Sequence, residues 1–112
     1  MPAWIGSASP TACWISAAGK DPLDYFKKYP GRFPLVHVKG LTKRPADGGA
    51  TPIQNVMPDL ADVGSNDVID WKRIFAKSDE AGIKHYFVEH DQPADPIATI
   101  RNSARYLAAL RY

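Results

Sequence analysis

The chain has 112 residues, the size of one small domain. Apolar residues make up 45% and charged residues 23%, as in an ordinary globular protein, which excludes a charged disordered tail, a collagen-like chain and a disulfide scaffold. The net charge of +2 arises from 14 Lys and Arg against 12 Asp and Glu, without any block of like charges. A nucleic-acid partner is therefore poorly supported.

No segment indicates a membrane span or an export signal. No apolar run approaches the roughly 18 residues that a transmembrane helix needs. Residues 1–18 are mildly apolar but lack a basic start, so they make a poor signal peptide, and a cytoplasmic location is the default expectation. The single cysteine, Cys13, cannot form an internal disulfide.

Two helices are predicted from the same start signal. Asp21-Pro22 and Asp95-Pro96 each place a side-chain acceptor before a proline that suits the first helical position. The first of these helices should end near Tyr29. The second should bury one apolar stripe, which consists of Ile97, Ile100, Ala104 and Leu107.

Strands and helices are predicted to alternate along the rest of the chain. Strands are expected at 33–39 and 84–89, with a remnant of a third at 12–15, and the first has apolar residues on both faces, as in a buried parallel sheet. A third helix should begin at Asp70 and end at Gly82. Residues 40–68 carry glycine and proline without a helical period and predict a long loop. This alternation favours a parallel sheet.

A histidine and a carboxylate lie near the ends of the two main strands. The carboxyl ends of parallel strands meet at one edge of a sheet, where binding sites are built. If the strands are neighbours, we expect the side chains of His37 and Glu89 within about 6 Å, because ligands of one metal ion each need bonds of about 2 Å. The alternative is a core histidine hydrogen-bonded to a loop and a glutamate that caps a neighbouring helix.

Four more polar residues lie near these strands. Lys39 shares a face with His37 and is a candidate contact for an anionic or hydroxyl-rich ligand, or else a solvated lysine at a strand end. His85 begins its strand, far from the site edge, and is expected on the surface. His90 and Asp91 lie in the loop after the second strand, where Asp91 could simply support a turn.

Three segments of the chain resemble a known protein family. They are DPLDYFKKYPGRFPLVHVK (21–39), DVGSNDVIDWKRIF (62–75) and AGIKHYFVEHDQPADPIATIRNSARYL (81–107). In this order they are similar to the C-terminal part of bacterial sugar phosphate isomerase/epimerase proteins, of the xylose-isomerase-like TIM barrel superfamily. The resemblance implies an α/β fold: a partial TIM (β/α)8 barrel, its last two to three β/α units, over 13–112. Residues 1–12 match nothing in the family and are expected to be unrelated or disordered.

The resemblance also implies a reaction, the metal-assisted isomerisation or epimerisation of a sugar or sugar phosphate. The family holds a divalent ion (Mn, Mg, Co or Zn) with a Glu/Asp/His/Glu set, one ligand from the end of each of the last four strands. His37 matches the histidine and Glu89 the final glutamate, which in the epimerases also moves a proton beside the carbonyl carbon. Lys39 and Trp14 are the implied substrate-binding positions.

The sequence departs from the family pattern in three places. The strand that carries the first glutamate is absent. Matching Trp14 to the family's tryptophan puts Thr11 at the aspartate position, and Gly40 replaces the usual aspartate of an "HVKD" strand end. With half of the ligands missing, we expect the chain on its own to bind a divalent ion weakly and to show no isomerase turnover.

Two other functions remain open at the level of the sequence. A catalytically inert barrel fragment could act as an interaction module, because the edges of two or three strands expose unpaired N–H and C=O groups through which copies can associate into a homo-oligomer. The same barrel could instead carry keto-sugar lyase or hydrolase chemistry, or endonuclease work, against which the low charge argues. No nucleic-acid or membrane partner is expected.

Overall fold

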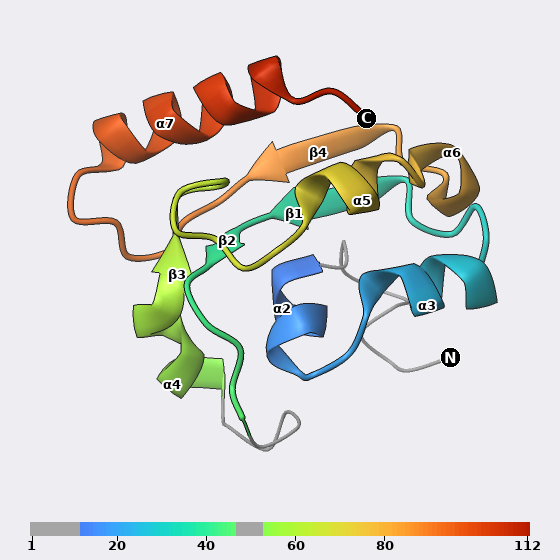
Figure 1. Cartoon of the computed structure of the whole chain (residues 1–112), viewed down its shortest axis with the longest axis horizontal. Helices are drawn as coiled ribbons and strands as arrows, with labels where there is room; N and C mark the ends of the chain where they lie inside the picture. The colour runs from blue at the N-terminus through green and yellow to red at the C-terminus, as the bar shows by residue number, and fades with distance from the viewer. Residues whose placement is uncertain (1–11, 47–52) are drawn as a thin grey trace.

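A computed structural model of the chain describes residues 12–46 and 53–112 as a mixed α/β arrangement (Figure 1). Its helices are α2 (Ala12–Ala17), α3 (Pro22–Lys28), α4 (Ile53–Val56), α5 (Trp71–Phe75), α6 (Ser78–Ala81) and α7 (Pro96–Ala109), with a 3-10 turn η1 at Met57–Asp59. Its strands are β1 (Leu35–Val38), β2 (Gly40–Leu41), β3 (Leu60–Ala61) and β4 (His85–Val88). Thr11 and the rest of the segment 1–11 lie outside the described residues, so the expectation for them stays a prediction.

The predicted parallel pairing is confirmed. β1 and β4 form a two-stranded parallel sheet in which His37 lies opposite Phe87 and Val38 opposite Val88. The chain passes from β1 to β4 through β2, β3, α5 and α6, and in Figure 1 the two strands point the same way. β2 and β3 form a short antiparallel pair.

The third strand predicted at 12–15 is wrong, because this segment is helical. Ile15, Ser16 and Ala17 in α2 are each less than 7% exposed. In the described part of the chain no further strand pairs with β1, so a strand here would leave its backbone groups without partners. A helix instead satisfies them within the segment.

The predicted helix ends are confirmed by local hydrogen bonds. The Asp21 carboxylate accepts from the backbone N–H of Leu23 at 3.0 Å, and the Asp95 carboxylate accepts from those of Ile97 and Ala98. Gly82 ends α6 with a φ of +80°, in the left-handed region that favours glycine. The helix predicted between Asp70 and Gly82 is split into α5 and α6.

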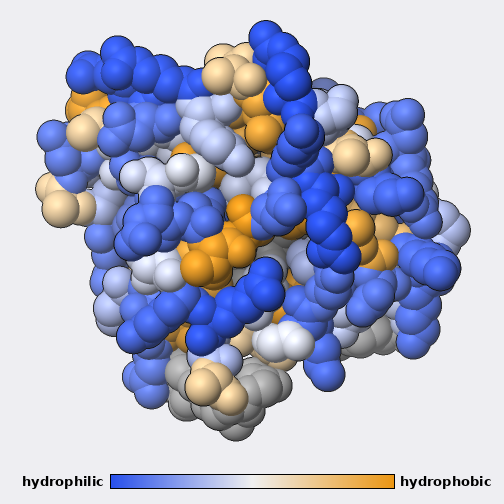
Figure 2. Space-filling model, in the orientation of Figure 1, coloured by the Kyte–Doolittle hydropathy of each residue, from blue (hydrophilic) through white to orange (hydrophobic). Residues whose placement is uncertain are grey.

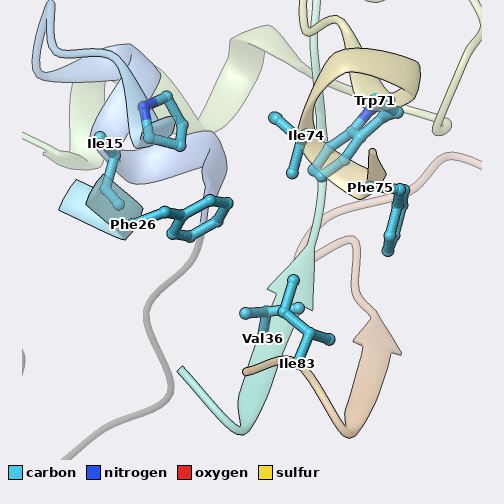
Figure 3. A pocket seen from close by; sticks show the side chains of 8 residues that line it. Ile15, Phe26, Val36, Trp71, Ile74, Phe75 and Ile83 are labelled. Carbon is cyan, nitrogen blue, oxygen red and sulfur yellow. The ribbon is translucent and has the colours of Figure 1, made fainter. Parts of the chain in front are cut away.

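The core lies on one face of the sheet. Val36 and Val38 of β1 are buried against helices, and Figure 3 shows Val36 among apolar side chains of α2, α3 and α5 around a cavity of about 10 Å³. This cavity is apolar and no larger than about one water molecule, so it is a packing gap rather than a ligand site. The opposite face is open, because Leu35 is 41% exposed. The prediction that both faces are buried is therefore wrong.

The predicted buried stripe of α7 is wrong at three of its four residues: Ala104 is exposed like the two isoleucines, and Leu107 packs partly buried against the core. Ile97 and Ile100 are 65% and 62% exposed, whereas Thr99 and Ser103 are buried. The Ser103 hydroxyl accepts from the buried backbone N–H of Val63 at 3.0 Å. A buried N–H without a partner would cost about as much free energy as a lost hydrogen bond. The bond from Val63 avoids this cost, and it holds the Ser103 side of α7 inward while Ile97 and Ile100 face outward.

Within 40–46 and 53–68 the predicted loop contains regular structure, namely β2, α4, η1 and β3. The segment is tied down by the Asp67 carboxylate. Its Oδ1 accepts from the backbone N–H of Leu41 and Ile69 at 3.0 Å each. Its Oδ2 accepts from the backbone N–H of Gly64 at 3.0 Å and from Trp71 Nε1 at 2.6 Å. One side chain thus joins β2 to the start of α5.

Replacement of Asp67 by asparagine should destabilise the fold, because both carboxylate oxygens accept hydrogen bonds and an amide offers only one acceptor. In the Asp67→Asn variant an NH2 group in place of Oδ2 would face two N–H donors, those of Gly64 and Trp71, and could accept from neither. We expect a loss of about 3 kcal/mol in the free energy of unfolding, measured by urea denaturation. Asp79→Asn, at an exposed position in α6, is the matched control and should change stability by less than about 0.5 kcal/mol. Equal stability of the two variants would contradict the assigned role of Asp67.

Candidate functional site

The side chains of His37 and Glu89 meet at the carboxyl ends of the parallel strands. The backbone N–H of Glu89 donates to the carbonyl of Val38 at 3.0 Å, so Glu89 extends the β1–β4 pairing by one residue. His37 Nε2 lies 3.4 Å from Glu89 Oε1, and the two side chains are 32% and 38% exposed. The predicted closeness of these groups is confirmed, and their role stays a prediction.

The separation of these two atoms fits adjacent ligands of one metal ion. Two donors at bonds of about 2.1 Å in a tetrahedral site lie about 3.4 Å apart, which is the distance between His37 Nε2 and Glu89 Oε1. Imidazole nitrogen and carboxylate oxygen also suit Zn²⁺, Mn²⁺ and Co²⁺. The described residues contain no group of three or more His, Cys, Asp or Glu that could hold a metal ion. A metal ion at this position would therefore need further ligands besides His37 and Glu89.

Lys39 is buried beside this pair. Its ammonium lies 2.9 Å from Glu89 Oε2 and 2.7 Å from Asp91 Oδ2, and its side chain is 6% exposed. The alternative of a solvated lysine is therefore wrong. Burial lowers the pKa of Lys39 by desolvation, but the hydrogen bonds and charges of Asp91 and Glu89 outweigh it and hold the pKa above its ordinary value. Lys39 is a cation at neutral pH, bonded to one oxygen of Glu89 while the other faces His37.

Asp91 is the site residue whose role the sequence reasoning missed. From the sequence Asp91 is a weaker site candidate that could simply support a turn; in the structure its carboxylate binds Lys39. The sequence contains a signal for this role. Glu89 and Asp91 are two residues apart, and this spacing puts both carboxylates on one side of an extended segment. His90, between them, has a buried Nδ1 without a hydrogen-bond partner in the described structure.

An open hollow of about 350 Å³ adjoins Glu89, large enough for a small molecule. It lies between the end of β4 and the first turns of α7, and its walls include His90, Thr99 and Ile100. The hollow is bordered by both polar and apolar surface. Of the cavities described here, this one has a predicted site residue, Glu89, in its wall.

The other predicted positions do not join the site. Trp14 lies in α2, on a helix rather than at a strand end, and its proposed substrate contact stays a prediction. His85 is exposed, as predicted. At Gly40 an added Cβ would lie 2.5 Å from the carbonyl oxygen of Ala61, so the pairing of β2 with β3 leaves no room for the aspartate that the family pattern has there.

No protein-family model matches the chain, and no curated protein matches it. Among the described helices, none has the length and apolar character that a membrane span requires.

Loss of the Lys39 charge should destabilise the protein in a pH-dependent way. Lys39→Met leaves the carboxylates of Glu89 and Asp91 facing each other without a cation, and we expect a loss of about 1–2 kcal/mol at pH 7, since both carboxylates are partly exposed. A raised pKa in the folded protein stabilises it fully below the unfolded value of about 10.4, and this stabilisation is lost as the pH rises through the folded value. The difference between wild type and variant should therefore shrink above about pH 10.4.

Urea denaturation at pH 7, 9 and 11 measures this difference. Lys43→Met is the matched control, because Lys43 pairs with Asp59 at 3.5 Å while its side chain is 72% exposed. It should change stability by less than about 0.5 kcal/mol at each pH. A Lys39→Met penalty that stays constant to pH 11 would contradict the assigned charge of Lys39.

Proposed function

We propose that this protein takes part in the metal-assisted isomerisation or epimerisation of a sugar or sugar phosphate. The observation that carries the proposal is the 3.4 Å separation of His37 Nε2 and Glu89 Oε1 at the ends of adjacent parallel strands. The resemblance of these strand ends to those of sugar phosphate isomerase/epimerase proteins supports it. The parallel β1–β4 pair, with helical segments in the connection, is also the kind of unit that the last part of a TIM barrel contains.

A divalent ion held by His37 and Glu89 would polarise the carbonyl and hydroxyl oxygens of the sugar and stabilise an enediolate. In this proposal the Glu89 carboxylate would take the proton from the carbon beside the carbonyl. Lys39 holds Glu89 Oε2 at 2.9 Å and so fixes the orientation of the carboxylate with Oε1 toward His37. The hollow beside Glu89 gives the sugar a place next to this group.

A second candidate is a catalytically inert module that binds other chains through β4. The exposure of Tyr86, Phe87 and Val88, at 47%, 51% and 37%, favours it. A keto-sugar lyase or hydrolase on the same fold is a third candidate and differs from the first in its products. Stoichiometric metal bound through Glu89 separates the inert module from the two enzymes, and a product analysis separates the enzymes from each other.

Proton transfer can be tested without full turnover. We expect the protein with Mn²⁺ or Co²⁺ to exchange the hydrogen beside the carbonyl of a ketose phosphate for deuterium in D2O. Net formation of an isomer should be absent from the chain on its own, because one of the two proton-transfer carboxylates is missing. Glu89→Gln should lower the exchange rate by about 100-fold or more, followed by NMR or mass spectrometry.

Asp79→Asn is the control for this experiment, since it removes an exposed carboxylate elsewhere. Its exchange rate should equal that of the wild type. Exchange that survives Glu89→Gln, or that is absent at saturating metal across a panel of aldose and ketose phosphates, would overturn the proposal.

A further inference from the structure

The outer edge of β4 is open in the described structure. All residues of β4 are exposed, and Phe87 at its centre is 51% exposed. Within residues 12–46 and 53–112, β1 is the strand that pairs with β4, and no second one does. In the view of Figure 2 hydrophobic surface also remains exposed between the hydrophilic side chains. An edge of this kind is a template for another strand.

The hydrogen bonds to β1 show which backbone groups point outward. The N–H groups of His85 and Glu89 donate inward, to the carbonyls of Pro34 and Val38 at 3.1 and 3.0 Å. Alternate residues of a strand point their backbone groups to opposite edges. The N–H and C=O groups of Tyr86 and Val88 therefore face the open edge.

We propose that β4 pairs antiparallel with β4 of a second copy, with Phe87 on the two-fold axis, and that the partner's His85 completes the metal site of His37 and Glu89. The proposal rests on the proposed function in one respect, that these two side chains hold the metal ion. Its oligomeric part stands on the strand edge alone.

The outward groups restrict the register of this pairing. Hydrogen-bonded pairs across the new edge can form only between even-numbered residues, of which Tyr86 and Val88 lie within β4. With Phe87 on the axis, Tyr86 exchanges both backbone bonds with the partner's Val88, and an aromatic side chain lies beside a β-branched one. A register centred on Tyr86 would instead place Val88 opposite the partner's Lys84. The Phe87-centred register alone sets the apolar residues 86–88 of one copy against those of the other.

The charges at the two ends of β4 favour the same arrangement. Lys84 precedes the strand and Glu89 follows it. Antiparallel pairing brings the basic end of one copy to the acidic end of the other, whereas parallel pairing would set like charges together. The edge is thus complementary to itself under a two-fold axis, as a symmetric dimer requires.

This register brings a third metal-ligating side chain to the site. It places the partner's His85 directly opposite Glu89, as a non-hydrogen-bonded pair with Cα atoms about 4.5 Å apart. Odd-numbered residues of β4 share the face that carries His37, because His37 lies opposite Phe87 in the sheet. The resulting set of two histidines and one carboxylate is a common donor set for divalent transition metals. The two-fold axis creates two such sites.

Strand pairing and metal binding should therefore support each other. Ile100 lines the same hollow as Val88 and is 62% exposed, so apolar surface continues from the strand to α7. A strand edge alone buries less than the roughly 800 Å² per partner of a standard interface. An ion that binds the dimer but only weakly binds the monomer shifts the equilibrium toward the dimer by mass action.

The first test asks whether Phe87 lies on the axis. Phe87→Lys and Phe87→Glu each place like charges face to face, so each variant alone should sediment as a monomer at concentrations where the wild type dimerises. An equimolar mixture should dimerise again, because lysine then faces glutamate. Circular dichroism of each variant is the check that it folds like the wild type. A wild-type monomer at all concentrations with and without Zn²⁺, or a mixture that stays monomeric, would overturn the pairing.

The second test asks whether the partner's His85 is a ligand. His85→Ala and Glu89→Gln should each lower Co²⁺ affinity at least tenfold, followed by the visible absorption of bound cobalt. In a mixed dimer, the His85→Ala copy keeps its own His37 and Glu89 and receives His85 from the other copy. The mixture should therefore regain wild-type affinity, with up to one ion per mixed dimer.

The outcomes separate this inference from the proposed function. Wild-type affinity in His85→Ala, or no recovery on mixing, refutes the shared site even if deuterium exchange into the sugar proceeds. Recovery on mixing establishes the shared site even if no sugar exchanges its hydrogen, in which case the proposed reaction is wrong.

Discussion

The parallel register of β1 and β4 is the constraint on which the site depends. It sets His37 opposite Phe87 and brings Glu89 to within 3.4 Å of the imidazole. The same register directs the backbone of alternate β4 residues toward β1 and leaves those of Tyr86 and Val88 facing outward. A shift of one residue would move Glu89 to the covered face and dismantle both the donor pair and the open edge.

The charge balance at the strand ends explains why two carboxylates can lie close together there. Lys39 is buried, and burial alone would disfavour its charge, but Glu89 and Asp91 each lie within 3 Å of its ammonium. The Lys39 ammonium and the two carboxylates therefore lower the free-energy cost of burying one another. Because Lys39 engages one oxygen of Glu89, the other oxygen stays directed to His37, beside a fixed positive charge.

Local chemistry was predictable from the sequence and tertiary choices were not. The caps at Asp21, Asp70 and Asp95 depend on residues within one turn, and all three formed as predicted. The strand ends of the site were predictable because parallel strands finish at one edge. The exposure of the apolar stripe of α7 was not predictable, because the orientation of this helix depends on contacts such as the hydrogen bond from Val63 to Ser103, which are 40 residues apart. The helical state of 12–15 likewise depends on which strands are available to pair.

The composition of β4 distinguishes an interface from an ordinary sheet edge. Proteins that keep a strand edge solvated place a lysine, a proline or a bulge within it. The centre of β4 is Tyr86-Phe87-Val88, with its polar residues confined to the ends. A charge in the middle would repel an identical copy, whereas opposite charges at the two ends disfavour parallel pairing of two copies and favour antiparallel pairing. In the proposed dimer the histidine at one end meets the glutamate at the other, so the pairing that covers the edge would also supply the further ligand that a metal site at His37 and Glu89 needs.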